Sequence, residues 1–142
     1  MNTGTLLADQ DIFRGSILEN LTMGNEKISM DEVTYLAEKT GLSSFISGEE
    51  KGYDTILDPT GKRISKHVKQ KIKLIRALAG KPSLLLLEDP LMDLEFNEKN
   101  SIMNYLKEET HATIILISNE ETVHLYCDKV YTISEGNINQ KI

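Results

Sequence analysis

The chain has 142 residues, a length typical of one compact domain. Its hydrophobic fraction of 39% and charged fraction of 27% are those of an ordinary soluble protein with a core, and they exclude a disordered chain. The 22 acidic and 16 basic residues give a net charge of −6, which argues against a dedicated nucleic-acid binder. The single Cys127 excludes an internal disulfide, and no apolar run is long enough to cross a membrane. We therefore expect no direct membrane insertion and a reducing, cytoplasmic location.

The first half of the chain is predicted to be helical. Residues 16–47 have the pattern of short helices, and the clearest of these runs from Met30 to Thr40. Ser29 followed by Glu32 is typical of a capping box, and Gly41 suits the left-handed residue that ends a helix. Pro59 and Gly61 interrupt residues 52–63, so we expect a loop there.

The second half alternates helices with apolar strands. A helix with Ser65 as its N-cap carries an apolar stripe, and it is expected to end before Gly80 and Pro82. Strands are predicted at residues 84–87, 113–117 and 129–133, with helices at 97–107 and 120–126 between them. The first strand is an unbroken apolar run, as in parallel strands that helices cover on both faces. A turn at 134–137 predicts a closing antiparallel hairpin, so the fold class is α/β with a mainly parallel sheet.

A basic cluster precedes the first of these strands. It holds seven of the sixteen basic residues and no carboxylate. Three explanations remain open: a solvated helix face, a contact with phosphate or with acidic neighbours, and a nucleic-acid patch. The cluster lacks the interleaved aromatic residues that single-strand binders use for stacking, which disfavours the third. Its members are Lys62, Arg63, Lys66, Lys69, Lys71, Lys73 and Arg76.

Two acidic residues, Glu88 and Asp89, directly follow the apolar run Leu84–Leu87. Open α/β sheets bind ligands at the carboxyl ends of their strands, and carboxylates there can hold Mg²⁺ beside nucleotide phosphates. An acidic pair can also simply end a strand at the surface. Asn119 follows the next strand, where it suits either a nucleotide contact or a helix cap.

Five segments, taken in order, resemble the second half of an ATP-binding-cassette (ABC) transporter nucleotide-binding domain of the exporter type. They are IFRGSILENLTMGN (12–25), GYDTILDPTGKRIS (52–65), KIKLIRALAGKPSLLLLEDP (71–90), TIILISN (113–119) and CDKVYTISEGNI (127–138). The resemblance implies a P-loop NTPase-like half domain over residues 1–142. Residues 16–80 would form its helical subdomain, and residues 81–142 would belong to the ATPase core.

The resemblance also implies roles for single residues. Glu88 would be the acid on the Mg²⁺ side, and Asp89 the acid that orients the attacking water. Asn119 stands at the switch-histidine position, and Ser65 with Lys66 stands in the signature stretch that contacts ATP. Gln10 is the candidate for the loop glutamine. The implied cofactors are ATP and Mg²⁺.

Nearly every one of these motifs departs from the family pattern. No GxxxxGK[ST] phosphate loop, the Walker A motif, occurs in the chain. Lys66 and His67 replace two glycines of the signature stretch, and their side chains obstruct a close backbone approach to phosphate. The order of the acidic pair is inverted, and Asn119 cannot change charge as a histidine does. We therefore expect little or no ATPase activity from the chain alone.

The resemblance predicts a chain that couples ATP binding and hydrolysis to transmembrane export. Its partners would be a permease domain, at the inner face of the membrane, and a second ATP-binding domain, including a second copy of itself. One alternative is a non-catalytic regulatory module that pairs with a complete ATPase subunit. A weaker alternative is a nucleic-acid-associated cassette protein that uses the basic cluster.

Overall fold

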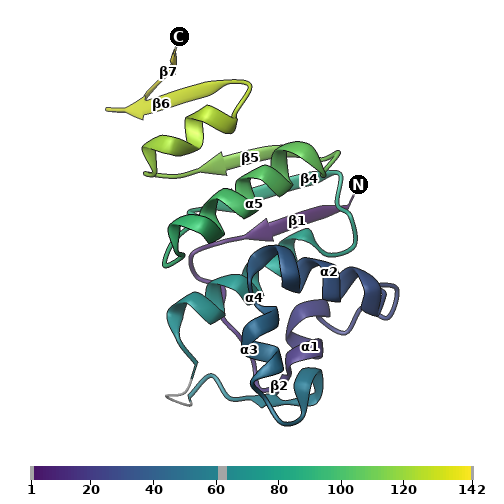
Figure 1. Cartoon of the computed structure of the whole chain (residues 1–142). Helices are drawn as coiled ribbons and strands as arrows, with labels where there is room; N and C mark the ends of the chain where they lie inside the picture. Colours follow the sequence, from purple (N-terminus) through teal and green to yellow (C-terminus); the bar gives the residue numbers. More distant parts are fainter. Residues whose placement is uncertain (1, 61–63, 142) are drawn as a thin grey trace.

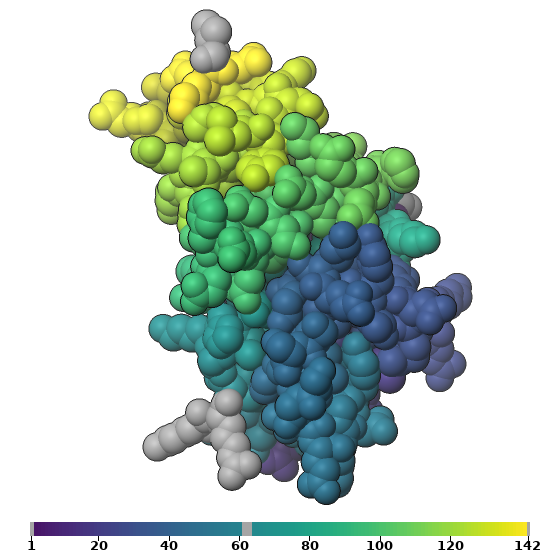
Figure 2. Space-filling model, viewed as in Figure 1, coloured from purple at the N-terminus to yellow at the C-terminus, as the bar shows by residue number. Residues whose placement is uncertain are grey.

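The computed structural model describes residues 2–60 and 64–141. Figure 1 shows the helices α1 to α4 gathered at one end of the molecule, the parallel sheet next to them, and the β6–β7 hairpin at the far end. The space-filling view shows the same elongated outline, with the hairpin as the upper tip (Figure 2). The elements are β1 (Thr3–Leu6), β2 (Gly15–Ser16), α1 (Ile17–Thr22), α2 (Met30–Thr40), α3 (Ser43–Ser47), η1 (Gly52–Asp54), β3 (Ile56–Leu57), α4 (Lys66–Leu78), β4 (Leu84–Glu88), α5 (Phe96–Glu108), β5 (Thr113–Ile117), η2 (Glu121–Tyr126), β6 (Val130–Ser134) and β7 (Asn137–Lys141).

The main sheet has three parallel strands in the order β1-β4-β5. Thr3 pairs with Leu84 and Leu84 pairs with Thr113, so the three strands start level with one another. The strands predicted at 84–87 and 113–117 are confirmed, as is the α/β class with a mainly parallel sheet. β1 was not predicted, and it brings the first residues of the chain into the same sheet as β4 and β5.

The two faces of this sheet differ in burial. On one face Leu6, Leu85 and Leu87 are almost fully buried and join the hydrophobic core. On the other face of β5, Ile115 and Ile117 are 56% and 64% exposed. The expectation that helices cover both faces is therefore met on one face only in the described residues.

Helix α2 has the predicted bounds and begins after Ser29 as predicted, but the capping box is incomplete. The Ser29 hydroxyl accepts a hydrogen bond from the Glu32 N–H at 3.2 Å, as an N-cap does. Glu32 does not return the bond that would complete a capping box, because its Oε1 accepts from the Gly80 N–H at 2.8 Å. Gly41 ends the helix at φ +80°, a left-handed conformation that favours glycine. The bond from Glu32 to Gly80 ties the start of α2 to the end of α4.

Helix α4 is the centre of the helical part. Ser65 caps it as predicted, and its apolar stripe of Val68, Ile72 and Ile75 is buried. Lys71 is also buried, and its ammonium group forms an ion pair with the Glu98 carboxylate on α5. This pair joins the helical part of the chain to the helix that packs beside the sheet.

A Glu98→Gln substitution is expected to remove stability near neutral pH and to change it little in acid. Burial raises the pKa of Glu98, but hydrogen bonds from Lys71 and from the Glu95 N–H, together with the Lys71 charge, outweigh burial and lower this pKa. A lowered folded-state pKa gives stability that is present above the unfolded pKa and lost as the pH falls through the folded value. Urea unfolding at pH 7 and at acid pH, compared between the two chains, measures this. An equal difference at both pH values would contradict the assignment.

The sequence predicts a loop at residues 52–63, but the described part of this stretch is only partly a loop. It contains η1 and the short strand β3, which pairs antiparallel with β2. Residues 61–63 of this stretch lie outside the described residues.

The C-terminal hairpin is confirmed, since β6 and β7 pair antiparallel across a turn at Glu135 and Gly136. The predicted strand at 129–133 is present as β6, but β6 pairs with β7 and not with the parallel sheet. The segment at 120–126 is a 3-10 helix, η2.

Candidate functional site

The carboxyl end of β4 turns sharply at the acidic pair. Asp89 has a φ of +44°, a left-handed conformation that is uncommon for a residue other than glycine. Its N–H donates to the Ile117 carbonyl at 2.8 Å, so the end of β4 is fastened to the end of β5. This turn directs the chain away from the sheet immediately after the strand.

An open cavity of about 390 Å³ lies beside this turn. It contains two of the predicted site residues, Asp89 and Asn119, which come from the ends of the neighbouring strands β4 and β5. Carboxylate and amide oxygens of this kind are ligands that suit Mg²⁺. The full lining is Asp89, Leu91, Met92, Asp93, Lys99, Ser118, Asn119 and Glu120.

Sequence reasoning did not single out Asp93, Lys99 or Glu120, although each lines the cavity. The Lys99 ammonium is bound to the Glu120 carboxylate, and this ion pair links α5 to the start of η2. Asp93 is left-handed at φ +64°. No spacing signal marks these residues, because a loop, the helix α5 and the start of η2 bring them together only in the folded chain.

Two further predicted residues, Glu88 and Gln10, do not line this cavity. Glu88 Oε2 accepts a hydrogen bond from the Ala8 N–H at 2.9 Å, which ties the end of β4 to the loop after β1. Gln10 folds back on the same loop, where Oε1 accepts from the Leu7 N–H at 3.0 Å and Nε2 donates to the Thr5 hydroxyl at 3.2 Å. Both side chains therefore form hydrogen bonds within the fold, near the carboxyl end of β1.

Ser65 and Lys66 lie at the N-terminus of α4, and they do not line this cavity either. Both are exposed, and the Ser65 hydroxyl accepts from the Val68 N–H at 3.4 Å. The N-terminal end of a helix carries free N–H groups and a partial positive charge, which favours anions. The structure therefore places the signature-stretch candidates apart from Asp89 and Asn119.

The basic cluster is not a solvated face over most of the part that the structure describes. Lys71 and Lys73 are 4% and 8% exposed, and the Lys69 ammonium lies 3.6 Å from an Asp11 carboxylate oxygen. The guanidinium group of Arg76 donates to oxygens of Asp11 and Asn20. Contact with groups of the fold itself is the explanation that holds for these side chains, while Lys62 and Arg63 lie outside the described residues. A helix in which these cations face inward is a poor nucleic-acid surface.

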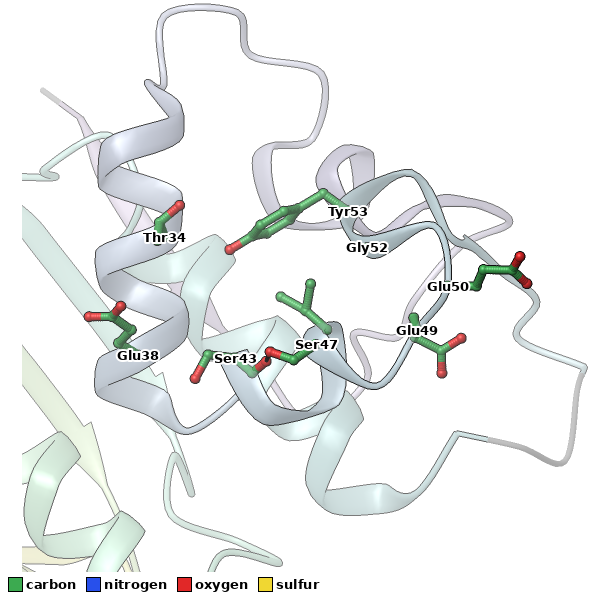
Figure 3. A pocket seen from close by; sticks show the side chains of 9 residues that line it. Thr34, Glu38, Ser43, Ser47, Glu49, Glu50, Gly52 and Tyr53 are labelled. Carbon is green, nitrogen blue, oxygen red and sulfur yellow. Dashed lines mark hydrogen bonds between the residues drawn. The ribbon is translucent and has the colours of Figure 1, made fainter.

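A second open cavity, of about 420 Å³, lies between α2, α3 and η1. Tyr53 reaches toward Thr34 on α2, while the Glu50 side chain points away (Figure 3). Its lining offers hydroxyl groups and the carboxylates of Glu38, Glu49 and Glu50, but no lysine, arginine or histidine. The cavity at Asp89 has as many carboxylates, but it also has Lys99 and lies at the strand ends, so it is the better candidate for a nucleotide.

Among residues 2–60 and 64–141, no three His, Cys, Asp or Glu side chains are grouped closely enough to hold a metal ion by themselves. Within the same ranges, no helix has the length and apolar character to cross a membrane. A metal ion at Asp89 would therefore need ligands from outside the protein as well, as Mg²⁺ takes from phosphates and water.

Comparison with known proteins gives a consistent result. ABC transporter B family member 1 of Dictyostelium discoideum is 34% identical over 133 residues, which cover 91% of this chain and 14% of that protein. The chain is related to a part of the ABC transporter ATP-binding proteins. The alpha-hemolysin translocation ATP-binding protein HlyB of Escherichia coli is 29% identical over 136 residues, which cover 95% of this chain and 19% of HlyB. No family model matches the chain.

A solved structure of a bacterial Atm1-family ABC exporter with ATP bound has the same fold over 94% of this chain, with a TM-score of 0.83 and 25% identity. The resemblance to ABC exporters that the sequence indicated is thereby confirmed. The chain spans 24% of that exporter and about a fifth or less of the curated ABC relatives. Whether this chain shares the activity of the whole ABC relatives is therefore a proposal.

Proposed function

We propose that the chain is part of the nucleotide-binding domain of an ABC exporter, and that it couples ATP binding and hydrolysis to transmembrane export. One observation carries this proposal. Asp89 and Asn119, from the ends of two neighbouring parallel strands, line one cavity in a chain related to ABC transporter ATP-binding proteins. The carboxyl edge of a parallel α/β sheet is where such folds bind nucleotides.

The donor set at this edge suits ATP with Mg²⁺. Bound Mg²⁺ would neutralise phosphate charge, and the carboxylates of Glu88 and Asp89 would supply oxygen ligands to it or orient a water molecule. Glu88 keeps Oε1 for this purpose, because its bond to the Ala8 N–H uses Oε2. The Asn119 amide would donate to a phosphate oxygen. Ser65 and Lys66, at the start of α4, would meet phosphate held by a second ATP-binding domain.

The residue changes at these positions support slow hydrolysis. Inverting the acidic pair moves one carboxylate outward and the other inward by about one methylene, and a misplacement near 1 Å can cost on the order of 100-fold in rate. Lys66 and His67 crowd a helix start where glycines would let phosphate approach. We therefore propose binding with little turnover, at a cytoplasmic site beside a permease domain.

The same changes favour a second candidate, a non-catalytic module that pairs with a complete ATPase subunit or with a second copy of this chain. The nucleic-acid alternative receives no support, because Lys71 and Arg76 bind groups of the fold itself. Nucleotide binding at the acidic pair separates the two remaining candidates.

The decisive experiment is a titration of the 142-residue chain with ATP, with and without Mg²⁺, followed by the backbone amide signals of Asp89 and Asn119. We expect Mg²⁺-dependent shifts at both residues, with a dissociation constant on the order of 1 mM, which is about −4 kcal/mol of binding free energy. In a Glu88→Ala, Asp89→Ala double variant, the Mg²⁺-dependent shift at Asn119 should be lost.

The matched control is a Glu49→Ala, Glu50→Ala double variant, which removes the same charge at the other cavity and should bind as the original chain does. Phosphate release by the chain alone should be only slightly faster than in the Glu88, Asp89 variant, in line with the proposed slow turnover. Identical shifts without Mg²⁺, or no shifts at all, would overturn the nucleotide-binding proposal and leave the non-catalytic module.

A further inference from the structure

One buried polar side chain outside the predicted site contacts the turn at Asp89. Gln70, on α4, is only 2% exposed. Its Nε2 donates to the carbonyl oxygens of Asp89 and Pro90, each at 3.0 Å. An amide nitrogen has two donor hydrogens, so these two bonds use its full donor capacity. A buried amide aimed at two successive peptide carbonyls fixes the backbone at that point.

The backbone that Gln70 holds contains Asp89, one of two left-handed aspartates that line the cavity. Asp89 is left-handed, and a non-glycine residue stays in that region only when its surroundings hold it there. Its N–H is bound to Ile117 on β5, and its carbonyl is bound to Gln70 on α4. The peptide groups on both sides of Asp89 are thus fastened to different elements, and the direction of the Asp89 carboxylate follows from them.

The next residue of α4 holds the far end of the same segment. Lys71 binds Glu98 on α5, and Glu98 Oε2 accepts from the Glu95 N–H at 3.0 Å. Gln70 and Lys71 together therefore fasten both ends of residues 89–95 to α4. Ser65, the cap of the same helix, lies five residues before Gln70, or about 7.5 Å along the helix axis.

We infer that Gln70 is a positioning residue that holds the Asp89–Pro90 turn in its left-handed form and links α4 to the acidic pair. The claim that this turn serves nucleotide binding rests on the proposed function, whereas the claim that Gln70 holds the turn does not. A shift of α4 would move the Asp89 and Pro90 carbonyls through these two bonds. The two candidate regions, at the start of α4 and at the end of β4, would then respond to each other.

The test uses Gln70→Met in the full 142-residue chain, which keeps the length of the side chain and removes both donors. The readout is the Asp89 Cα chemical shift, which reports its left-handed backbone, together with hydrogen exchange of the Asp89 N–H. We expect the Cα shift to move and the exchange to accelerate by about tenfold or more, the scale of one lost hydrogen bond. Mg²⁺–ATP should then bind more weakly, or not at all, to the variant.

Thr40→Val is the matched control, because Thr40 is 1% exposed and its hydroxyl bonds lie within α2. It should leave the Asp89 signals unchanged. If Gln70→Met does not fold, the original chain still provides a measurement, since the Gln70 side-chain amide should show slow exchange. A fast-exchanging amide, an unmoved Asp89 shift in Gln70→Met, or an equal movement in Thr40→Val would each overturn the inference. Absence of ATP binding in the original chain would instead count against the proposed function alone.

Discussion

A Gly4→Ala substitution is expected to destabilise the folded chain by at least about 3 kcal/mol, because no room exists for a single added carbon. A Cβ atom at Gly4 would lie 1.9 Å from the Ala77 carbonyl oxygen and 2.8 Å from Leu85 Cδ2. The Ala77 oxygen belongs to the backbone of α4, so no side-chain rotation relieves the clash. β1 would have to separate from α4, which would open the buried face of the sheet.

Urea unfolding followed by circular dichroism measures this loss. Gly48→Ala is the control, since its φ is −76° and a Cβ there would lie 3.5 Å or more from the nearest atoms. Its free energy of unfolding should change by no more than about 0.5 kcal/mol. Equal losses for the two variants would show that β1 does not pack against α4 as described.

The close approach at Gly4 explains why β1 was missed in the sequence. The segment TGTL has no apolar run, and its pairing partner β4 lies some 80 residues away along the chain. The strand that was predicted best, β4, is an unbroken run of leucines that needs no partner to be recognised. A glycine that lets a strand approach a helix closely leaves no periodic pattern in the sequence. The need for a glycine at this position is visible only in the packed structure.

The charged residues of α4 also show what a sequence pattern cannot predict. The apolar stripe of the helix was predicted correctly, but periodicity says nothing of a lysine that finds a carboxylate inside the fold. Lys71 does so with Glu98, which lies 27 residues further on. Glu32 likewise had the spacing of a capping box and bound Gly80 instead. Local rules identify the polar side chains, and the tertiary fold decides their partners.

For the candidate site, strand ends were a good guide to position. Asp89 was predicted from the end of an apolar strand and Asn119 from its place at the switch-histidine position of the ABC resemblance. The parallel pairing of β4 with β5 brings both residues to one cavity. The residues that hold this edge together, Gln70 and Lys99, come from helices and left no pattern in the sequence. The catalytic and binding roles of all these residues stay predictions.

The second large effect is expected at Arg76, whose guanidinium group joins α4 both to Asn20 of α1 and to the loop between β1 and β2. It donates to the Asn20 carbonyl at 2.6 Å, to Asn20 Oδ1 at 2.8 Å and to the Asp11 carbonyl at 2.7 Å, and it lies 5.4 Å from the centre of the Phe13 ring. Burial lowers the pKa of Arg76, and the charge of Asp11 opposes this. Asn20 is fully buried, so its oxygens have no water to replace the guanidinium.

Arg76→Met is therefore expected to cost about 3 kcal/mol or more of folding free energy, because it strands buried acceptors that were bound to a charged donor. Arg76→Lys should lose less folding free energy than Arg76→Met but still be less stable than the original chain. Its ammonium group keeps the charge but cannot reach all three oxygens as the planar guanidinium group does. Arg14→Met is the control: the Arg14–Asp58 pair spans 2.7 Å, but the Arg14 side chain is 74% exposed. Exposed pairs of this kind contribute at most about 1 kcal/mol. Urea unfolding should show the largest loss of stability in Arg76→Met, a smaller loss in Arg76→Lys and the smallest in Arg14→Met. A loss in Arg14→Met as large as that in Arg76→Met would mean that charge, rather than the buried hydrogen bonds, stabilises this part of the fold.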